Sequence, residues 1–289
     1  MGLGPEAANT KLDEFEASWD SKDCLLYAVS VGAGAVDLTS ELAFTTENSH
    51  KVQQRVLPTF GVLAAGCGGR VEGQALTALE LGAEVVMRGV HGAQEIEIFD
   101  EIPVEGRVRV VPMISAVQAK TTGTAMTVDA KAFRVDDDRL LFAARSTMFF
   151  RGIGADPEAK SSGAGDEVVI PDTEPKHTLT YNVRPEQALL YRLNGDRNPL
   201  HSDPKFAKLA GFGTPILHGL CTYGFAGRAL VQTACGGDPG ALAAVFGRFT
   251  KPVLPGDDLT VSVWEGDQVV YRVETQRGDK VLEGWCRLR

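Results

Sequence analysis

Residues 191–204, which read YRLNGDRNPLHSDP, say more about fold and function than any other stretch of this chain. Asp196 and His201 lie five positions apart across an Asn-Pro turn. Because Pro199 keeps the preceding residue out of the helical region, this backbone is predicted to be a loop. A tight loop can turn both side chains toward one site, where they hold a water molecule and move its protons. The simpler alternative is that Asp196 only stabilises the turn and His201 only packs in the core. The neighbouring motifs must decide between a catalytic and a structural pair.

Two helices are predicted to follow this loop. Asp203 is a favourable N-cap and Pro204 a favourable first residue, so a short helix begins there and stops at Gly211. A longer helix is expected from Ile216 to about Ala234. It is rich in small residues and poor in charge, which favours a helix wrapped closely by a sheet over an ordinary amphipathic helix.

Gly219 falls in the first turn of the longer helix, within the run PILHGL at residues 215–220. Its N–H would lack an intrahelical partner and would lie at the positive end of the helix dipole. Such an N–H can donate to a carbonyl oxygen on which negative charge develops. Close packing of helix on sheet would explain this glycine equally well.

The two halves of the chain are similar in pattern. Both contain a Pro, a Gly turn and an alternating strand, at residues 102–110 and 253–261. Further strands are expected at residues 125–135 and 140–150 in the first half, and at 268–275 and 280–288 in the second. An internal duplication is therefore predicted.

A Gly- and Ser-rich stretch near the middle of the chain is typical of a linker. We expect an N-terminal tail at residues 1–19, a first domain at 20–152, a linker at 153–175 and a second domain at 176–289.

The composition excludes several classes of protein. The chain has 289 residues, of which 44% are apolar and 23% are charged, so it can bury a core. Its net charge of -9 disfavours binding to nucleic acid or to an anionic membrane surface. The sequence contains no apolar run of the roughly 18–20 residues that a membrane span needs. The histidines and cysteines lack metal-ligand spacing, so we expect no metal.

The cysteine pattern and the chain ends bear on location. The five cysteines are widely spread without a CxxC motif, which favours a reducing compartment. The acidic, polar start does not match a secretory signal, and the final Arg-Leu-Arg is not the Ser-Lys-Leu peroxisomal address. We expect a cytoplasmic protein, with a peroxisomal one as the alternative.

Taken together, these motifs resemble the hydratase 2 family, the MaoC-like, R-specific 2-enoyl-CoA hydratases. The matching pieces are residues 26–34, 56–60 and 90–94 in the first half and 191–203, 209–212, 215–224 and 248–256 in the second. The resemblance covers residues 20–289 and implies an α+β, double hot-dog fold. In that fold each half is an antiparallel sheet wrapped around a central helix.

The resemblance also implies roles at matching positions. Asp196 and His201 would be the catalytic dyad that holds the water, with Asn198 as a polar helper. Gly219 would supply the oxyanion-hole N–H. The residues implied to contact the acyl-CoA substrate are His91, Gly92, Lys120, Arg197, Pro199, Leu200 and Phe249.

The chain departs from the family pattern in its first half. The family commonly has Leu-His-Gly-Glu-Gln where this chain has VHGAQ at residues 90–94, so no role can be carried over for the missing Glu. The first half also lacks an Asp-x-Asn-Pro-x-x-His loop. We expect it to be catalytically empty and to accommodate the acyl chain.

The implied activity is a hydro-lyase reaction that converts a trans-2-enoyl-CoA to a (3R)-3-hydroxyacyl-CoA in fatty acid metabolism. No cofactor is expected beyond the coenzyme A of the substrate, and a homodimer is expected. Three alternatives stay open. They are dehydration of 3-hydroxyacyl groups on an acyl carrier protein, a thioesterase, and a non-catalytic acyl-CoA binding module.

Overall fold

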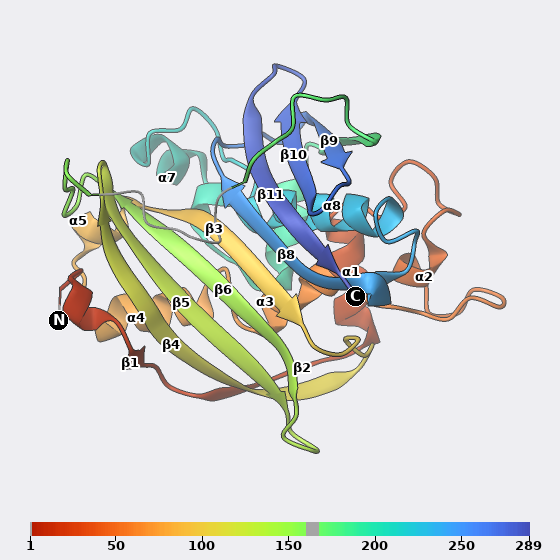
Figure 1. Cartoon of the computed structure of the whole chain (residues 1–289), viewed down its shortest axis with the longest axis horizontal. Helices are drawn as coiled ribbons and strands as arrows, with labels where there is room; N and C mark the ends of the chain where they lie inside the picture. Colours follow the sequence, from red (N-terminus) through yellow and green to blue (C-terminus); the bar gives the residue numbers. More distant parts are fainter. Residues whose placement is uncertain (1, 160–167) are drawn as a thin grey trace.

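The computed structural model describes residues 2–159 and 168–289. Within these ranges, both halves of the chain contribute to one antiparallel sheet of 11 strands (Figure 1). The first half supplies β1 (Thr10–Lys11), β2 (Phe15–Trp19), β3 (Gly89–Ile98), β4 (Gly106–Lys120), β5 (Gly123–Arg134) and β6 (Leu140–Arg151). The second half supplies β7 (His177–Asn182), β8 (Leu242–Phe249), β9 (Asp258–Trp264), β10 (Val269–Thr275) and β11 (Lys280–Leu288).

The order of the strands repeats when it is followed outward from the middle of the sheet. β3 and β8 pair at the centre, where Ile96 lies opposite Val245. Next come β6, β5 and β4 on one side and β11, β10 and β9 on the other. β2 pairs with β4, and β7 pairs with β9. The same unit therefore occurs twice, which confirms the predicted duplication and the double hot-dog fold.

The strands at the start of the chain belong to this sheet. Residues 10–19, which the sequence analysis assigned to a tail, form β1 and β2 and pair with β4. The physical reason is that β2 has an alternating pattern, with the large side chains of Phe15 and Trp19 buried against the core. At the other boundary, β6 ends at Arg151 and β7 begins at His177. Part of the expected linker, residues 160–167, lies outside the described residues.

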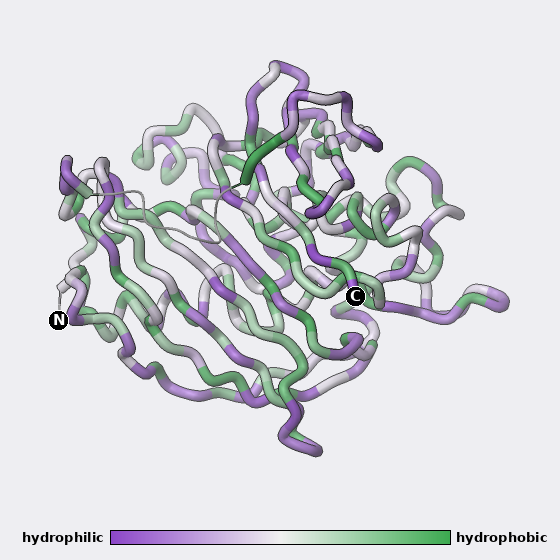
Figure 2. The backbone as a smooth tube through the Cα atoms, viewed as in Figure 1, coloured by the Kyte–Doolittle hydropathy of each residue, from purple (hydrophilic) through white to green (hydrophobic). Residues whose placement is uncertain are grey.

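Helices cover one face of the sheet, and in Figure 1 most of them lie behind it. They are α1 (Ser21–Ser30), α2 (Leu42–Thr45), α3 (Gly61–Ala64), α4 (Arg70–Ala78), α5 (Ala83–Val86), α6 (Gln187–Tyr191), α7 (Pro204–Leu209) and α8 (Gly219–Gln232). Figure 2 shows hydrophobic and hydrophilic residues alternating along the long strands, because one face of each strand meets the helices and the other meets solvent.

The buried helix predicted from the sequence is α8, which begins at Gly219 because the residues before it are extended. All side chains from Leu220 to Val231 are buried. A Cβ atom on Gly224 would lie 2.4 Å from the side chain of Val31. Small residues on α8 therefore allow close contact with the first half of the chain as well as with its own sheet.

The central helix of the first half is interrupted. α3 ends at Ala64 and α4 begins at Arg70. Between them Gly66 and Gly68 have φ angles of +82° and +83°, in the left-handed region that favours glycine. The expectation of one central helix in each half therefore holds for α8, whereas the first half has two short helices joined by a glycine turn.

An ion pair joins the two halves inside the core. Arg228 of α8 donates from Nε to Glu41 Oε1 at 2.6 Å, and both side chains are buried. Glu41 precedes α2 in the first half. The five cysteines are buried and unpaired with one another. Within the described ranges, no helix combines the length and the apolar character that crossing a membrane would require.

Candidate active site

The predicted loop lies between α6 and α7 and contains a 3₁₀ turn at Pro199–His201. Asp196 Oδ1 accepts a hydrogen bond from the Asn198 N–H at 3.1 Å. Asn198 Oδ1 in turn accepts one from the Leu200 N–H at 3.0 Å. Each side chain therefore closes the turn that follows it, as Asx turns do. The side chain of Asn198 shapes this loop as a cap.

His201 is buried in a defined orientation. Its Nδ1–H donates to the carbonyl oxygen of Ile216 at 2.9 Å. In the neutral ring, Nε2 is then the atom that carries the lone pair. Burial lowers the pKa of His201 to about 4, so the ring is neutral at pH 7. A neutral imidazole with one fixed donor and one free acceptor can accept a proton from a water molecule.

Asp196 is partly buried beside it. Burial, together with the nearby carboxylate of Glu72, raises the pKa of this carboxyl group to about 6. The hydrogen bond from the Asn198 N–H and the nearby His91 act in the opposite direction. Asp196 is therefore mainly ionised at pH 7 and can bind a proton within a physiological range of pH.

A second histidine, His218, joins this pair and was missed by the sequence analysis. Side-chain ligand atoms of Asp196, His201 and His218 all lie within 4.8 Å of one another. The His218 ring stacks on the His201 ring, with centroids 3.7 Å apart and planes inclined by 26°. The signal that could have revealed it is its place directly before Gly219, because the N-cap of α8 had to lie near the predicted oxyanion donor.

The donor set of this cluster resembles a metal site, but its geometry suits proton transfer better. Zn²⁺ takes ligands whose lone pairs converge tetrahedrally on the ion. The lone pairs of the two imidazoles lie in the planes of nearly parallel rings, and His201 Nδ1 is already bound to a carbonyl. The rings would have to rotate apart to share an ion.

Gly219 lies next to this cluster in the first turn of α8, as predicted, although the helix begins at Gly219 itself and not at Ile216. It is partly exposed. A Cβ atom there would lie 3.3 Å from the ring of Phe249 at the end of β8. The ring of His91 packs edge-on against Phe249, with centroids 5.0 Å apart. The structure therefore brings together three of the predicted residues, Gly219, Phe249 and His91, across the joint between β3 and β8.

Gly92 explains how His91 reaches this joint. The register of β3 against β6 shifts between His91 and Ala93, which is a bulge. His91 Nε2–H donates to the Ala93 carbonyl at 3.1 Å. A Cβ atom on Gly92 would lie 3.3 Å from the Thr147 carbonyl oxygen, which is tighter than ordinary contact. The glycine thus permits the bulge that directs His91 toward Phe249.

The first half also contributes a wall that the sequence analysis missed. A Cβ atom on Gly68 would lie 2.8 Å from Leu220 Cδ1 and 3.7 Å from Asp196 Oδ2. The buried carboxylate of Glu72 accepts hydrogen bonds from the N–H groups of Gly68 and Gly69, at 3.2 Å and 2.9 Å. The glycine turn between α3 and α4 therefore backs directly onto the Asp196 carboxylate. The paired glycines in the sequence were the available signal.

The remaining predicted contact residues lie further out. Lys120 ends β4, so β5 and β6 separate it from β3, and its Nζ donates to Gln118 Oε1 at 2.9 Å. Arg197 and Pro199 are exposed on the loop, and Leu200 is partly buried beside them. Arg197, Pro199 and Leu200 therefore flank the cluster on its own loop, whereas Lys120 is separated in the sheet from the strand that carries His91.

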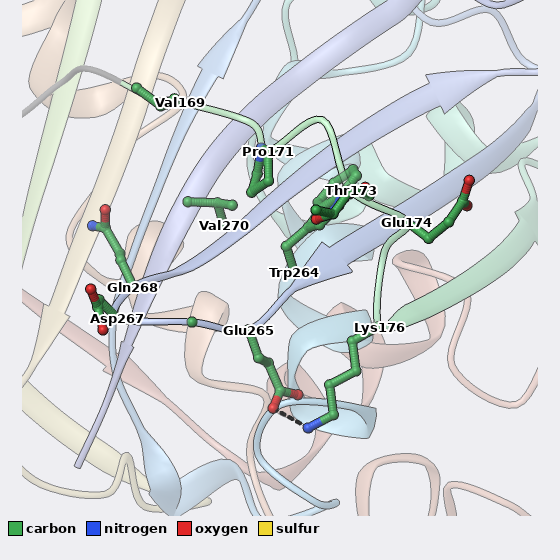
Figure 3. Close-up of a pocket in the computed structure, with 11 residues that line it drawn as sticks. Val169, Pro171, Thr173, Glu174, Lys176, Trp264, Glu265, Asp267, Gln268 and Val270 are labelled. Carbon is green, nitrogen blue, oxygen red and sulfur yellow. Dashed lines mark hydrogen bonds and ion pairs between the residues drawn. The ribbon is translucent and has the colours of Figure 1, made fainter.

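A surface hollow of about 350 Å³ lies elsewhere, between residues 169–176 and the turn that joins β9 to β10 (Figure 3). An ion pair between Lys176 and Glu265 lies along its edge. Its lining shares no residue with the cluster around Asp196.

Two family models match the chain in succession. The model described as MFE-2 hydratase 2 N-terminal domain matches residues 17–152, and the model described as MaoC like domain matches residues 167–284. The two matches correspond to the two repeats of the sheet.

Curated relatives align over nearly the whole chain. A protein of Mycobacterium tuberculosis named 3-hydroxyacyl-thioester dehydratase Y is 39% identical over 285 residues, which cover 96% of this chain and 94% of the relative. The peroxisomal enoyl-CoA hydratase 2 of Arabidopsis thaliana is 36% identical over 292 residues, covering 96% and 93%.

A solved structure supports the same assignment. The crystal structure of a MaoC-like dehydratase from Phytophthora capsici matches this chain with a TM-score of 0.86 and 27% sequence identity. The match covers 100% of this chain and 98% of that one. With both family models matched and relatives above one-third identity over more than nine-tenths of their lengths, the chain belongs to the hydratase 2 family of MaoC-like proteins.

Proposed function

We propose that this protein catalyses the reversible addition of water to trans-2-enoyl-CoA thioesters, giving (3R)-3-hydroxyacyl-CoA. The observation that carries the proposal is the convergence, on one loop, of an ionisable carboxylate and a neutral imidazole beside a helix N-terminus. Asp196 and His201 supply the two groups, and Gly219 begins the helix. Relatives named as enoyl-CoA hydratase and thioester dehydratase catalyse the two directions of one reaction, which supports this assignment.

The chemistry follows from these positions. The thioester oxygen accepts a hydrogen bond from the Gly219 N–H, which withdraws electron density from the C2=C3 bond and stabilises the enolate-like transition state. Asp196 and His201 orient one water molecule and remove its proton as the water oxygen bonds to C3. A proton delivered from the same pair to C2 completes the addition. Either of the two groups can act as the base in this scheme.

The rest of the substrate is proposed to cross the joint between the halves. His91, Gly92 and Phe249 would flank the thioester and the pantetheine arm. Lys120 and Arg197 would meet the charged part of coenzyme A, and Pro199 and Leu200 would border its path. The first half would take the acyl chain, and its turn at Gly68 already lies against Asp196.

The reverse direction on other thioesters is the second candidate. The Mycobacterium tuberculosis relative is named for dehydration of a 3-hydroxyacyl thioester, a name that leaves the thiol carrier open. The same dyad and oxyanion donor would serve an acyl group on coenzyme A or on a carrier protein. Initial rates on matched acyl-CoA and acyl-carrier substrates separate the two.

We also propose that the enzyme works without a cofactor, as a cytoplasmic homodimer. Five buried thiols suit a reducing compartment. A peroxisomal location is the alternative, since the Arabidopsis relative is named as peroxisomal. Light scattering on the purified protein tests the dimer, and fractionation of the source cells tests the location.

The first experiment follows the ultraviolet absorbance of crotonyl-CoA and trans-2-decenoyl-CoA, with chiral analysis of the product. Wild type should consume the enoyl thioester and yield the 3R alcohol, whereas Asp196→Asn should be slower by about 10²–10⁴-fold. Release of free coenzyme A without loss of the double bond would instead indicate a thioesterase. Binding of the substrate without turnover would indicate a binding module.

A further inference from the structure

His218 contacts both residues of the proposed dyad. Its Nε2–H donates to the main-chain carbonyl of Asp196 at 3.3 Å. Its ring stacks on the ring of His201, with centroids 3.7 Å apart. The His218 side chain therefore restrains both the backbone of Asp196 and the orientation of the His201 ring.

His218 is itself held by rigid parts of the fold. It is the N-cap of α8, whose side chains are buried from Leu220 to Val231. The ring of Tyr191 packs against it, with centroids 4.9 Å apart. His218 thus lies between two rings and is joined to the helix that presents the Gly219 N–H.

The ring of His218 is poorly placed to exchange protons with a substrate. Nε2 is occupied by the Asp196 carbonyl. Nδ1 is buried, and among the described residues it has no hydrogen-bond partner. Burial, with His201 close by, lowers the pKa of His218 to about 2, so the ring is neutral. These features point to a role that acts through the neighbours.

We propose that His218 is a positioning residue that ties the Asp196–His201 loop to the N-terminus of α8, and so fixes the bound water relative to the Gly219 N–H. The proposal rests on the proposed function. Its physical basis is that the loop carrying Asp196 is largely exposed, while the oxyanion donor sits on a buried helix. A displacement of about 1 Å between reacting groups can cost on the order of 10²-fold in rate.

Two substitutions separate the two contacts of His218. His218→Phe keeps an aromatic ring for stacking and removes the hydrogen bond to Asp196. His218→Gln keeps an N–H near the position of Nε2 and removes the ring. We expect each variant to lower kcat for crotonyl-CoA by about 10-fold or more, with KM changed less than about 3-fold, because the substrate contacts remain. The fraction of 3R product should also fall, since the water is less well fixed.

Stability and NMR keep this test independent of folding defects. His218→Phe eliminates a buried nitrogen without a partner, so its thermal midpoint should stay close to that of wild type while kcat falls. In ¹⁵N-histidine spectra, His201 of wild type should show a protonated Nδ1, and His218→Gln should weaken this preference. His50→Gln, in an exposed loop, is the matched control and should match wild type throughout.

The outcomes are distinguishable. If wild type turns over and both variants retain its kcat and its 3R product, His218 has no positioning role. If kcat falls only in proportion to lost folded protein, its role is structural and the proposal is wrong. If wild type itself hydrates no enoyl-CoA, the proposed function fails, and the His201 spectra of the two variants still decide whether His218 orients that ring.

Discussion

Asp196 is held in surroundings that favour its protonated form. Burial raises its pKa to about 6, from an ordinary value of 3.8. Because the folded protein binds this proton more tightly than the unfolded chain, stability falls as pH rises between these two values. Above pH 6 the ionised carboxylate therefore destabilises the fold, and catalysis uses this ionised form.

Substituting Asp196→Asn should separate stability from activity. We expect kcat to fall by about 10²–10⁴-fold, because the amide cannot accept the proton of water. The free energy of unfolding at pH 7 should rise, since no charge is then buried. Urea unfolding at pH 7 and at pH 4.5 checks this, because the gain should shrink at the lower pH. A loss of stability at pH 7 would contradict the assignment.

The pH profile of activity should report the same group. We expect kcat/KM to fall below about pH 6 as Asp196 becomes protonated. Glu72 and His91 both face this carboxylate and set its pKa in opposite directions. His201, with its pKa lowered to about 4, stays neutral over this range and adds no second limb. A profile that is flat from pH 5 to pH 8 would exclude Asp196 as the base.

At the scale of elements, the interruption between α3 and α4 is what lets the first half reach the dyad. A continuous helix would present side chains where the turn now presents bare backbone. Gly68, in the left-handed region, lies close to Asp196. The carboxylate of Glu72, near the start of α4, stabilises the turn by accepting hydrogen bonds from the N–H groups of Gly68 and Gly69. The half without a dyad therefore still shapes the proposed site.

Gly68→Ala tests the importance of this turn. The added Cβ would meet Leu220 Cδ1 at 2.8 Å, in a backbone conformation that disfavours alanine. We expect a loss of about 1 kcal/mol or more in stability and a fall in kcat of about 10-fold as the wall moves against Asp196.

The matched control lies in the next helix. Gly73→Ala in α4 has open space around the new methyl group and should stabilise the protein by up to about 1 kcal/mol with unchanged kcat. Equal kcat in wild type and Gly68→Ala would show that the turn does not act on the dyad.

For the whole molecule, the two halves are expected to unfold together. β3 pairs with β8 across the joint, and Gly224 of α8 packs on Val31, the residue directly after α1. The ion pair between Arg228 and Glu41 adds a buried polar link, to which Gln232 also donates at 2.8 Å. None of these contacts forms within one half alone.

Arg228→Ala should therefore destabilise the whole chain. Leaving Glu41 buried without its partner is expected to cost about 3–5 kcal/mol. Urea unfolding should keep one transition at a lower midpoint, and Arg88→Ala, which removes an exposed ion pair, should change stability by less than about 1 kcal/mol. Two separate transitions would mean that the halves fold independently.

The sequence by itself determined the features that depend on neighbouring residues. The Asn-Pro spacing produced the loop, and Asp203 caps α7 by accepting hydrogen bonds from the N–H groups of Lys205 and Phe206. The small residues of α8 indicated its burial, and the strand at Lys280–Leu288 has the predicted bounds. In these cases the local pattern and the tertiary structure favour the same conformation.

Only the tertiary structure decided which distant residues complete the site. Gly68 and Glu72 lie more than 100 positions before Asp196, and the stacking of His218 on His201 depends on how α8 meets the loop. The edge strands β1 and β2 were likewise missed, because a short strand is defined by the partner it pairs with. Such contacts depend on closing long loops around a shared core, and no local pattern specifies them.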